Sequence, residues 1–271
     1  NALLHRAKIK GDENLFNQAF QKYKKAIEIK PDMHEAYNNW GAALGELGKL
    51  KYEENIFIQS CQKFEQAIKI KPDSYNVYNN WGNALADWGN YKNDDKLFEQ
   101  ACQKYEQAIK IKPDMHEAYY NWGTTLYNWA KLKANEKLFE QACHKLEQTI
   151  KIKPDHHEAY NNWGAALCEL GKFKGDEKLF EQACHKLEQA VRIKPDKYEA
   201  YNNWGDIFIG LAKLKRSEPE KFESLLKQAE EKCLKAYSLK KGEGAYNLAC
   251  VYSLRGNKEE CKKWLLIGQE A

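Results

Sequence analysis

A 41-residue period runs through most of the chain. The segment Ile-Lys-Pro-Asp recurs at residues 29–32, 70–73, 111–114, 152–155 and 193–196, and a Trp-Gly pair follows each copy at the same distance. Periods of about 20 to 50 residues are typical of arrays in which one small structural unit stacks on its own copies. The sequence therefore predicts a repeat array.

Each unit contains two segments with the periodicity of an amphipathic helix. In residues 115–133, large apolar side chains recur at intervals of three and four, and residues 135–152 carry a second apolar stripe. Asp114, followed three residues later by Glu117, predicts a capping box at the start of the first helix. Each unit is thus predicted to be an antiparallel helical hairpin.

The order of large, small and aromatic residues in each unit resembles the tetratricopeptide repeat. In one unit the family's positions are filled, in order, by Tyr78, Trp81-Gly82, Leu85, Ala101, Tyr105, Ala108 and Pro113. The resemblance covers essentially the whole chain. It departs from the family in having Trp for the usual Leu and seven extra residues per unit, which we interpret as about one more turn on each helix. The resemblance implies an all-α fold, a right-handed superhelical α-solenoid of antiparallel helix hairpins.

The predicted organisation is a single solenoid over residues 1–271. A partial repeat covers 1–32, four 41-residue repeats cover 33–73, 74–114, 115–155 and 156–196, a repeat with a longer connection covers 197–241, and a last, incomplete repeat of ordinary length covers 242–271. The incomplete first and last repeats predict that further domains of the same polypeptide lie outside this sequence.

Charge and cysteine usage narrow the expected partners and location. With 43 basic and 39 acidic residues interspersed, the net charge of +4 is small, so neither nucleic acid nor a membrane surface is an expected partner. No run of 18 apolar residues occurs. Four of the eight cysteines follow the repeat period, which favours buried, reduced thiols and a cytoplasmic protein.

The sequence does not predict an enzyme. We find no Gly-rich phosphate loop, nucleophile elbow or metal-ligand cluster. The histidines at equivalent repeat positions favour surface decoration over one tuned catalytic base. No catalytic residue, metal site or cofactor is therefore predicted.

One or two asparagines precede each Trp-Gly pair, although Asn costs roughly 0.5 kcal/mol or more against Ala inside a helix. The first Asn gives way to Tyr120 and Tyr246, so we expect it to be dispensable. The second recurs in every unit: Asn39, Asn80, Asn121, Asn162, Asn203 and Asn247. The corresponding Asn in the tetratricopeptide arm of O-linked N-acetylglucosamine transferase forms a ladder that grips the backbone of an extended peptide. The resemblance implies the same role here, on the concave surface.

Side chains beside this predicted ladder are expected to set its preference. Four acidic residues, Glu46, Asp87, Glu169 and Asp206, are predicted on or beside the same wall, and Lys and Arg are absent from those positions. Such a groove should favour basic or neutral segments. Tyr120 and Tyr127 are predicted to add an apolar subsite.

These features predict a non-catalytic protein–protein interaction module that binds an extended peptide along its concave surface. Because the repeats are near copies, recent duplication would preserve neutral asparagines too. Two alternatives stay open. The array is a scaffold or self-association module, or it is the substrate-recruiting or regulatory arm of a larger enzyme, a glycosyltransferase or caspase-like peptidase, whose catalytic domain lies outside this chain.

Overall fold

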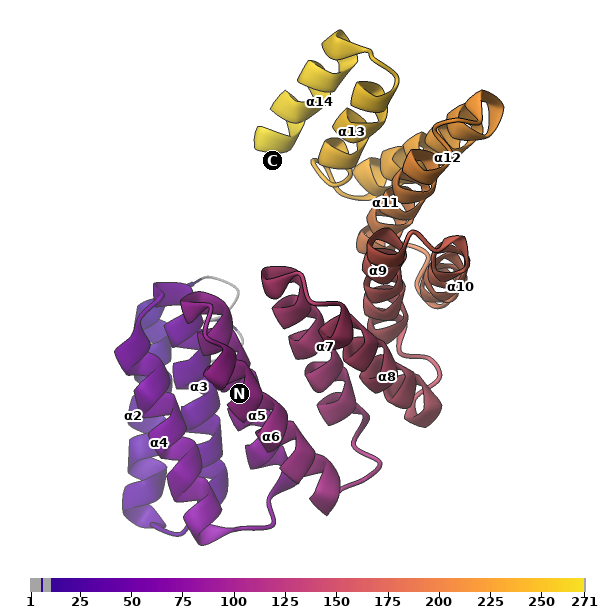
Figure 1. The fold of residues 1–271 in the computed structure, drawn as a ribbon. Helices are drawn as coiled ribbons and strands as arrows, with labels where there is room; N and C mark the ends of the chain where they lie inside the picture. The colour runs from indigo at the N-terminus through magenta and orange to yellow at the C-terminus, as the bar shows by residue number, and fades with distance from the viewer. Residues whose placement is uncertain (1–5, 7–10, 271) are drawn as a thin grey trace. The chain divides into compact units, whose positions relative to one another are not determined.

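The computed structural model describes residue 6 and residues 11–270, and these form thirteen helices and no strand (Figure 1). The helices alternate between two roles. Those that carry a Trp-Gly pair or its equivalent are called A helices here, and those that follow them are called B helices. Where both helices lie in the same compact unit, an A helix and the next B helix form an antiparallel hairpin, so the predicted all-α fold of helix hairpins is confirmed.

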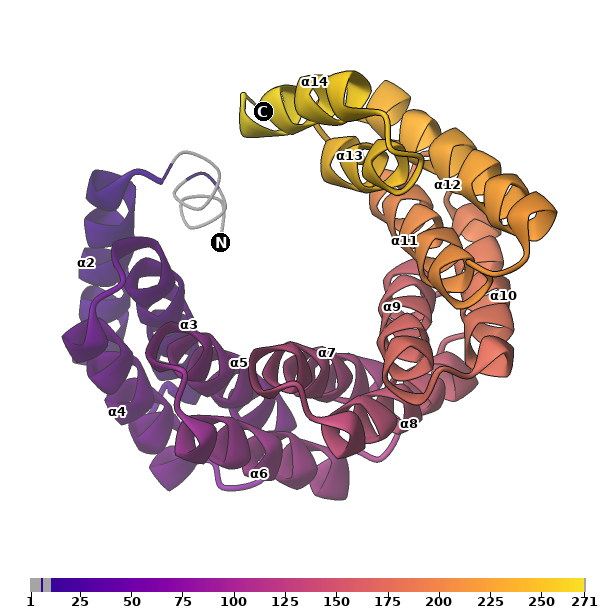
Figure 2. The same ribbon diagram turned by 45° about the horizontal axis from the view of Figure 1, so that its top comes forward.

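The chain divides into two compact units, residues 1–134 and 135–271. The first unit contains α2 (Glu13–Ile29), α3 (His34–Lys51), α4 (Glu54–Ile70), α5 (Tyr75–Lys92), α6 (Asp95–Ile111) and α7 (His116–Lys133). The A helices α3, α5 and α7 pack side by side in one layer, and the B helices α4 and α6 lie in the other (Figure 2).

The second unit repeats this arrangement. It contains α8 (Glu136–Ile152), α9 (His157–Lys174), α10 (Glu177–Ile193), α11 (Tyr198–Leu214), α12 (Pro219–Leu239), α13 (Ala245–Leu254) and α14 (Lys258–Gln269). Its A helices, α9, α11 and α13, again pack side by side. In α9 and α10 the helices have 18 and 17 residues, whereas α13 and α14 have 10 and 12. The longer repeats therefore extend both helices of the hairpin.

Each Lys-Pro-Asp segment forms the turn between two hairpins. The backbone N–H of Met33 donates to the Lys30 carbonyl at 3.1 Å, which closes a four-residue turn with Pro31 at its second position. Proline suits that position because its ring fixes φ near the value that the turn needs. The predicted capping box is wrong: Met115 is the N-cap of α7 and Asp114 lies before it, in the turn.

A left-handed residue follows four of the six A helices. The C-cap residues of α3, α5, α7 and α9 are Tyr52, Asn93, Ala134 and Gly175, which all have φ between 47° and 63°. Only glycine adopts this region without a steric cost from its side chain. Three of the four turns therefore carry backbone strain that the fourth avoids.

The Trp-Gly pairs build the core of each hairpin and its contact with the hairpin before. A Cβ on Gly82 would lie 2.6 Å from the buried ring of Tyr105 in α6, so only glycine lets the B helix approach this closely. Trp81 stacks on Phe64 of the preceding hairpin, with 6.3 Å between ring centroids, and the Lys104 ammonium lies 3.5 Å from the Trp81 ring centroid. The predicted structural role of this pair agrees with these contacts.

A periodic set of ion pairs joins successive hairpins. A lysine near the end of an A helix, or just after it, reaches an acidic residue in the first turn of the preceding B helix. The pairs are Lys51–Glu13, Lys92–Glu54, Lys133–Asp95, Lys174–Glu136 and Lys215–Glu177, and we call them the ion-pair ladder.

Within the described residues, no helix combines the length and apolar character needed to cross a membrane.

Candidate functional site

The asparagine pairs lie where neighbouring A helices meet. The second asparagines are half-buried, whereas the first ones at Asn79 and Asn161 are 7% exposed. We call the exposed side of the A-helix layer in each unit, including these pairs, the asparagine face. The candidate site consists of this face and the acidic and aromatic residues beside it.

Where two neighbouring hairpins lie in the same unit, the second asparagine of the later one donates a hydrogen bond to the earlier one. The Nδ2 group of Asn80 donates to Oδ1 of Asn38 at 3.2 Å, and Asn121 donates to Asn79 at 3.0 Å. In the second unit Asn203 donates to Asn161 at 3.0 Å. The first asparagine therefore has a contact that sequence reasoning missed, because it accepts this hydrogen bond.

The last hairpin keeps the bond although its own first asparagine is Tyr246. Asn247 donates to both Oδ1 and the backbone carbonyl of Asn202, at 3.0 and 3.1 Å. An acceptor is needed only on the preceding hairpin, so Tyr246 is compatible with the array.

Two of the pairs also have an internal hydrogen bond. Asn161 donates to Oδ1 of Asn162 at 3.1 Å, and Asn38 donates to Oδ1 of Asn39 at 3.5 Å. Together with the bonds between hairpins, these contacts form several separate groups of two or three hydrogen-bonded amides, which we call the asparagine relay. A carboxamide has two N–H donors and an oxygen that accepts twice, so the relay uses only part of each group's capacity.

The acidic residues of the first unit lie beside a lysine that sequence reasoning missed. The Lys49 ammonium is 3.0 Å from Asp87 Oδ1. Partial burial alone would lower the pKa of Lys49, but the Asp87 and Glu46 carboxylates raise it. The predicted negative charge of this wall is therefore partly compensated. The spacing of three residues between Glu46 and Lys49 could have indicated that they lie on the same face of one helix. The contact of Lys49 with Asp87 could not be predicted, because it depends on how α3 packs against α5.

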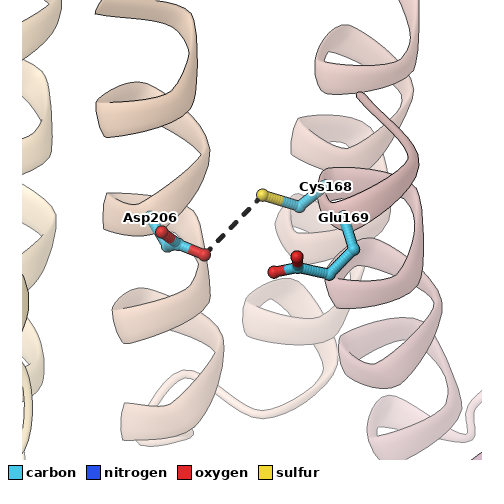
Figure 3. Close-up of side chains that lie close together, drawn as sticks. All are labelled: Cys168, Glu169 and Asp206. Carbon is cyan, nitrogen blue, oxygen red and sulfur yellow. Dashed lines mark hydrogen bonds between the residues drawn. The ribbon is translucent and has the colours of Figure 1, made fainter. Parts of the chain in front are cut away.

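In the second unit Glu169 and Asp206 surround a buried thiol (Figure 3). Cys168 Sγ lies 3.8 Å from Asp206 Oδ2, and the Lys172 ammonium bonds to Glu169 at 2.9 Å and to Asp206 at 2.6 Å. Burial, followed by the nearby Asp206 carboxylate, raises the pKa of Cys168 well above its usual value. The thiol therefore stays protonated, and Lys172 supplies the positive charge between the carboxylates.

A small hollow lies between α3 and α5 on the asparagine face. Its volume is about 150 Å³, and its lining residues are Ala42, Gly45, Glu46, Asn80, Asn83, Ala84 and Asp87. Three of the predicted site residues, Asn80, Glu46 and Asp87, are thus brought together, and Asn83 is an addition that sequence reasoning missed. The hydroxyl of Tyr105 donates to Asn83 Oδ1 at 2.8 Å and fixes that side chain.

The two tyrosines predicted to form an apolar subsite are both on α7 and half-buried. The Lys131 ammonium lies 5.6 Å from the Tyr127 ring centroid. Tyr120 occupies the position of a first asparagine, directly before Asn121. Their role in binding stays a prediction.

The arrangement of helices is similar to that in solved structures of repeat proteins. PilF of Pseudomonas aeruginosa matches with a TM-score of 0.56 and 17% identity, over 88% of this chain and 97% of that one. PilW, a widely conserved type IV pilus biogenesis factor, gives 0.56 and 17%, over 84% and 90%. YrrB, a TPR protein with an unusual peptide-binding site, gives 0.53 and 18%, over 80% and 97%. No curated protein matches the sequence.

The fold and these likenesses define a helical-repeat protein of the tetratricopeptide type. The chain belongs to the family described as plant-specific mitochondrial import receptor subunit TOM20, which matches residues 12–121 and 135–247. The prediction of a cytoplasmic protein is therefore wrong, because the family's description places it at the mitochondrion. Buried, reduced thiols do not distinguish the two locations.

A receptor family and repeat-protein neighbours support the coarser prediction, a protein–protein interaction module.

Proposed function

We propose that this chain is an import receptor module that binds a segment of a mitochondrial precursor protein on its asparagine face. The main support for this proposal is membership of the receptor family, because an import receptor must bind proteins of many sequences. The asparagine face suits such a task, since its carboxamides offer both donors and acceptors to any backbone.

The spacing of the A helices fits an extended segment. Neighbouring helices pack about 10 Å apart, and three extended residues span a similar distance at about 3.3 Å each. One asparagine would then meet one backbone amide at every third residue of the bound segment. Each such contact contributes about 1 kcal/mol, before the costs of ordering the segment. Weak binding with little sequence preference is the expected result.

Charge adds a preference for basic or neutral segments. Glu46 and Asp87 in the first unit and Glu169 and Asp206 in the second lie beside the asparagines, with Lys49 and Lys172 compensating part of their charge. A segment rich in acidic residues would meet like charge at both places.

Binding of a fluorescent precursor protein to the full chain tests the proposal. We expect saturable binding of a precursor that keeps its targeting segment, and at least tenfold weaker binding of the same protein without that segment. Equal binding of both forms, or of neither, would contradict the receptor function. Sedimentation velocity over the same concentrations gives the oligomeric state and so tests the self-association alternative.

A pair of double variants separates a ligand contact from a structural role. Asn80→Ala with Asn121→Ala removes the proposed ligand contacts together with two bonds of the relay. Asn38→Ala with Asn79→Ala removes the same two bonds from the accepting side. If asparagines contact the ligand, only the first variant should lose about tenfold in affinity, although both lose stability. Equal affinities would show that the relay is purely structural.

A further inference from the structure

The surface on which a B helix receives the next hairpin is open at α14. Leu265 in α14 occupies the repeat position of Phe64 in α4 and Leu187 in α10. The A helix that follows packs against each of those two side chains, and both are 0% exposed. No described helix covers the same side of α14, and Leu265 is 40% exposed. The last hairpin therefore presents an uncovered copy of an interface that the chain fills elsewhere.

This open surface contains a hollow. Tyr246 and Leu254 of α13 and Cys261 and Leu265 of α14 contribute to its lining, and the Tyr246 side chain is 57% exposed. The volume of the hollow is about 360 Å³, within the range of about 300 to 1,000 Å³ that is usual for ligand sites. We call the hollow and the residues around it the end face. It is large enough for a bulky apolar side chain.

The chain itself shows which kind of element covers such a surface. Val77, Trp81 and Ala84 of α5 pack against Phe64, and the Trp81 ring stacks on the Phe64 ring. Their spacing of four and three residues places them on one face of α5. The element that fits the end face is therefore an amphipathic helix with large apolar side chains one turn apart.

Lysines surround the end face. Lys258 occupies the repeat position of Phe180 in α10 and Leu226 in α12, which are both fully buried. Lys258, Lys262 and Leu265 share one side of α14 at intervals of three and four, and Lys213 lines the hollow from α11. Among the described residues, none of these three exposed lysines forms an ion pair with a carboxylate.

The acidic residues of α14 lie on its other side. Glu259 and Glu260 are about 120° or more around the helix from Leu265, and Glu260 pairs with Lys263. The end face is thus apolar in its centre and positive at its rim. An acidic partner complements it, whereas a basic one meets like charge.

We propose that the end face docks an acidic amphipathic helix of a partner protein, which packs there as the A helix of a further hairpin would. A large apolar side chain of this helix fills the hollow against Leu265. Its carboxylates pair with Lys258, Lys262 and Lys213 at the rim. The proposal goes beyond precursor binding, because α14 lies outside the A-helix layer and the partner is acidic.

Fluorescence anisotropy with the full chain tests this docking. The probe is a labelled eighteen-residue peptide with Val, Trp and Ala at the spacing of Val77, Trp81 and Ala84, Glu on its outer face and Ala elsewhere. Its match carries Lys in place of every Glu. We expect the acidic peptide to bind with a Kd on the order of 100 μM and the basic one at least about fivefold more weakly. No saturation up to about 1 mM of protein, or equal affinity for both peptides, would overturn the proposal.

A pair of leucine variants locates the apolar contact. Leu265→Ser should weaken binding of the acidic peptide at least about fivefold, because the hollow loses its apolar wall. Leu234→Ser in α12 is the control, since Leu234 is 42% exposed and lies outside the lining of the hollow. Equal losses in both variants would overturn the assignment of the site. Circular dichroism confirms that each variant is folded.

A pair of lysine variants locates the charge. Lys258→Gln with Lys262→Gln should weaken binding of the acidic peptide several-fold. Lys137→Gln with Lys178→Gln changes the net charge equally at two exposed lysines of α8 and α10 and should leave the affinity as in the parent chain. Equal losses in both double variants would indicate a general charge effect and overturn the proposal.

Two other occupants give different results. If sedimentation velocity shows self-association that Leu265→Ser abolishes, while the acidic peptide does not bind, the occupant is a second copy of this chain and the proposal fails. Precursor binding should be the same for Leu265→Ser and the parent chain. A parallel loss of precursor and peptide would make the end face part of the precursor site and would also overturn the proposal.

Discussion

Tyr105 differs from its equivalents in the neighbouring repeats by a buried hydroxyl. The corresponding residue one period earlier is Phe64, and both rings are almost fully buried. The Tyr105 hydroxyl lies 2.8 Å from Asn83 Oδ1 and 3.2 Å from Thr125 Oγ1. Thr125 in turn replaces Ala84 of the preceding repeat. The repeat sequence has therefore changed at both partners together, and the pair joins α6 to α5 and to α7.

Removing one partner of this contact should destabilise the protein more than removing both. Tyr105→Phe leaves the buried Thr125 hydroxyl without its partner, and we expect a loss of about 1 to 2 kcal/mol in the free energy of unfolding. Tyr105→Phe with Thr125→Ala recreates the Phe64 and Ala84 pair and should recover most of that loss. Urea unfolding of both variants measures the difference. Equal or greater loss in the double variant would contradict this account.

At the scale of single residues, the sequence showed which side chains recur in each repeat but not which other side chains they contact. The recurrence of Asn80 and Asn121 was visible, but their bonds to Asn38 and Asn79 join residues 42 positions apart. Such a pairing depends on how two A helices pack, which no local pattern encodes. For the same reason the pairing of Asp87 with Lys49 became visible only in the structure.

Among the turns within hairpins, Ala134 and Gly175 form a natural comparison. Both residues are in the left-handed region, with φ of 47° and 63°. A Cβ on Gly175 would have no atom within 4 Å, so space is not limiting there and only the backbone conformation matters. The two positions therefore isolate the cost of a left-handed residue that carries a side chain.

Ala134→Gly should raise stability and Gly175→Ala should lower it. The left-handed conformation costs an L-residue roughly 1 to 2 kcal/mol. Glycine removes this cost, but its greater conformational entropy in the unfolded chain offsets part of the gain in stability. We expect changes of about 0.5 to 1 kcal/mol in opposite directions, measured by urea unfolding. The same sign for both substitutions would show that the turns are not strained as described.

The contact between α12 and α13 depends on a charged cluster. Arg255 bonds to Glu223 at 2.7 Å and to Glu230 at 2.6 Å, and the Tyr252 hydroxyl donates to Glu230. Partial burial alone would raise the pKa of Glu230, but the hydrogen bonds from Tyr252 and Arg255 hold it below its usual value. The folded state therefore favours the ionised carboxylate.

The stabilising contribution of this cluster to the free energy of unfolding should consequently decrease as the pH is lowered. Because the pKa of Glu230 is lower in the folded chain, its contribution is complete above the unfolded value of about 4.3 and is lost as the pH falls through the folded value. We expect Glu230→Gln to be less stable than the parent chain at pH 7, with a difference that shrinks below about pH 4. Glu231→Gln is the control, since the side chain of Glu231 is 73% exposed. A constant difference between pH 7 and pH 3 would contradict this assignment.

The helices themselves were predictable because their signals are local. Apolar side chains at intervals of three and four defined the hairpins, and the predicted segment 135–152 begins one residue before α8. The helix starts were less predictable. Asp114 followed by Glu117 has the pattern of a capping box. In the structure Asp114 lies in the turn that contains Pro113, and Met115 is the N-cap of α7. The long connection before Pro219 was visible from the break in the period.

Across the molecule, the ion-pair ladder predicts a common response to salt. Its side chains are mostly half-exposed, so each pair contributes no more than about 1 kcal/mol and is screened by added ions. We expect the midpoint of thermal unfolding to fall by a few degrees between about 20 mM and 500 mM sodium chloride. Lys92→Gln should reduce this dependence. A midpoint that rises with salt in the parent chain would contradict a stabilising ladder.

The asparagine relay gives the array a direction. Asn80 donates backwards to Asn38, while Asn79 of the same hairpin accepts from Asn121 ahead. A copy of residues 74–114 inserted after residue 114 would bring its own donor and acceptor, so every amide at the new junctions would again find a partner. An in-frame duplication or deletion of 41 codons therefore changes the length of the asparagine face without disturbing the hairpins on either side. Unequal crossing-over within such a gene would yield folded variants that differ in the number of repeats and so in the length of the asparagine face.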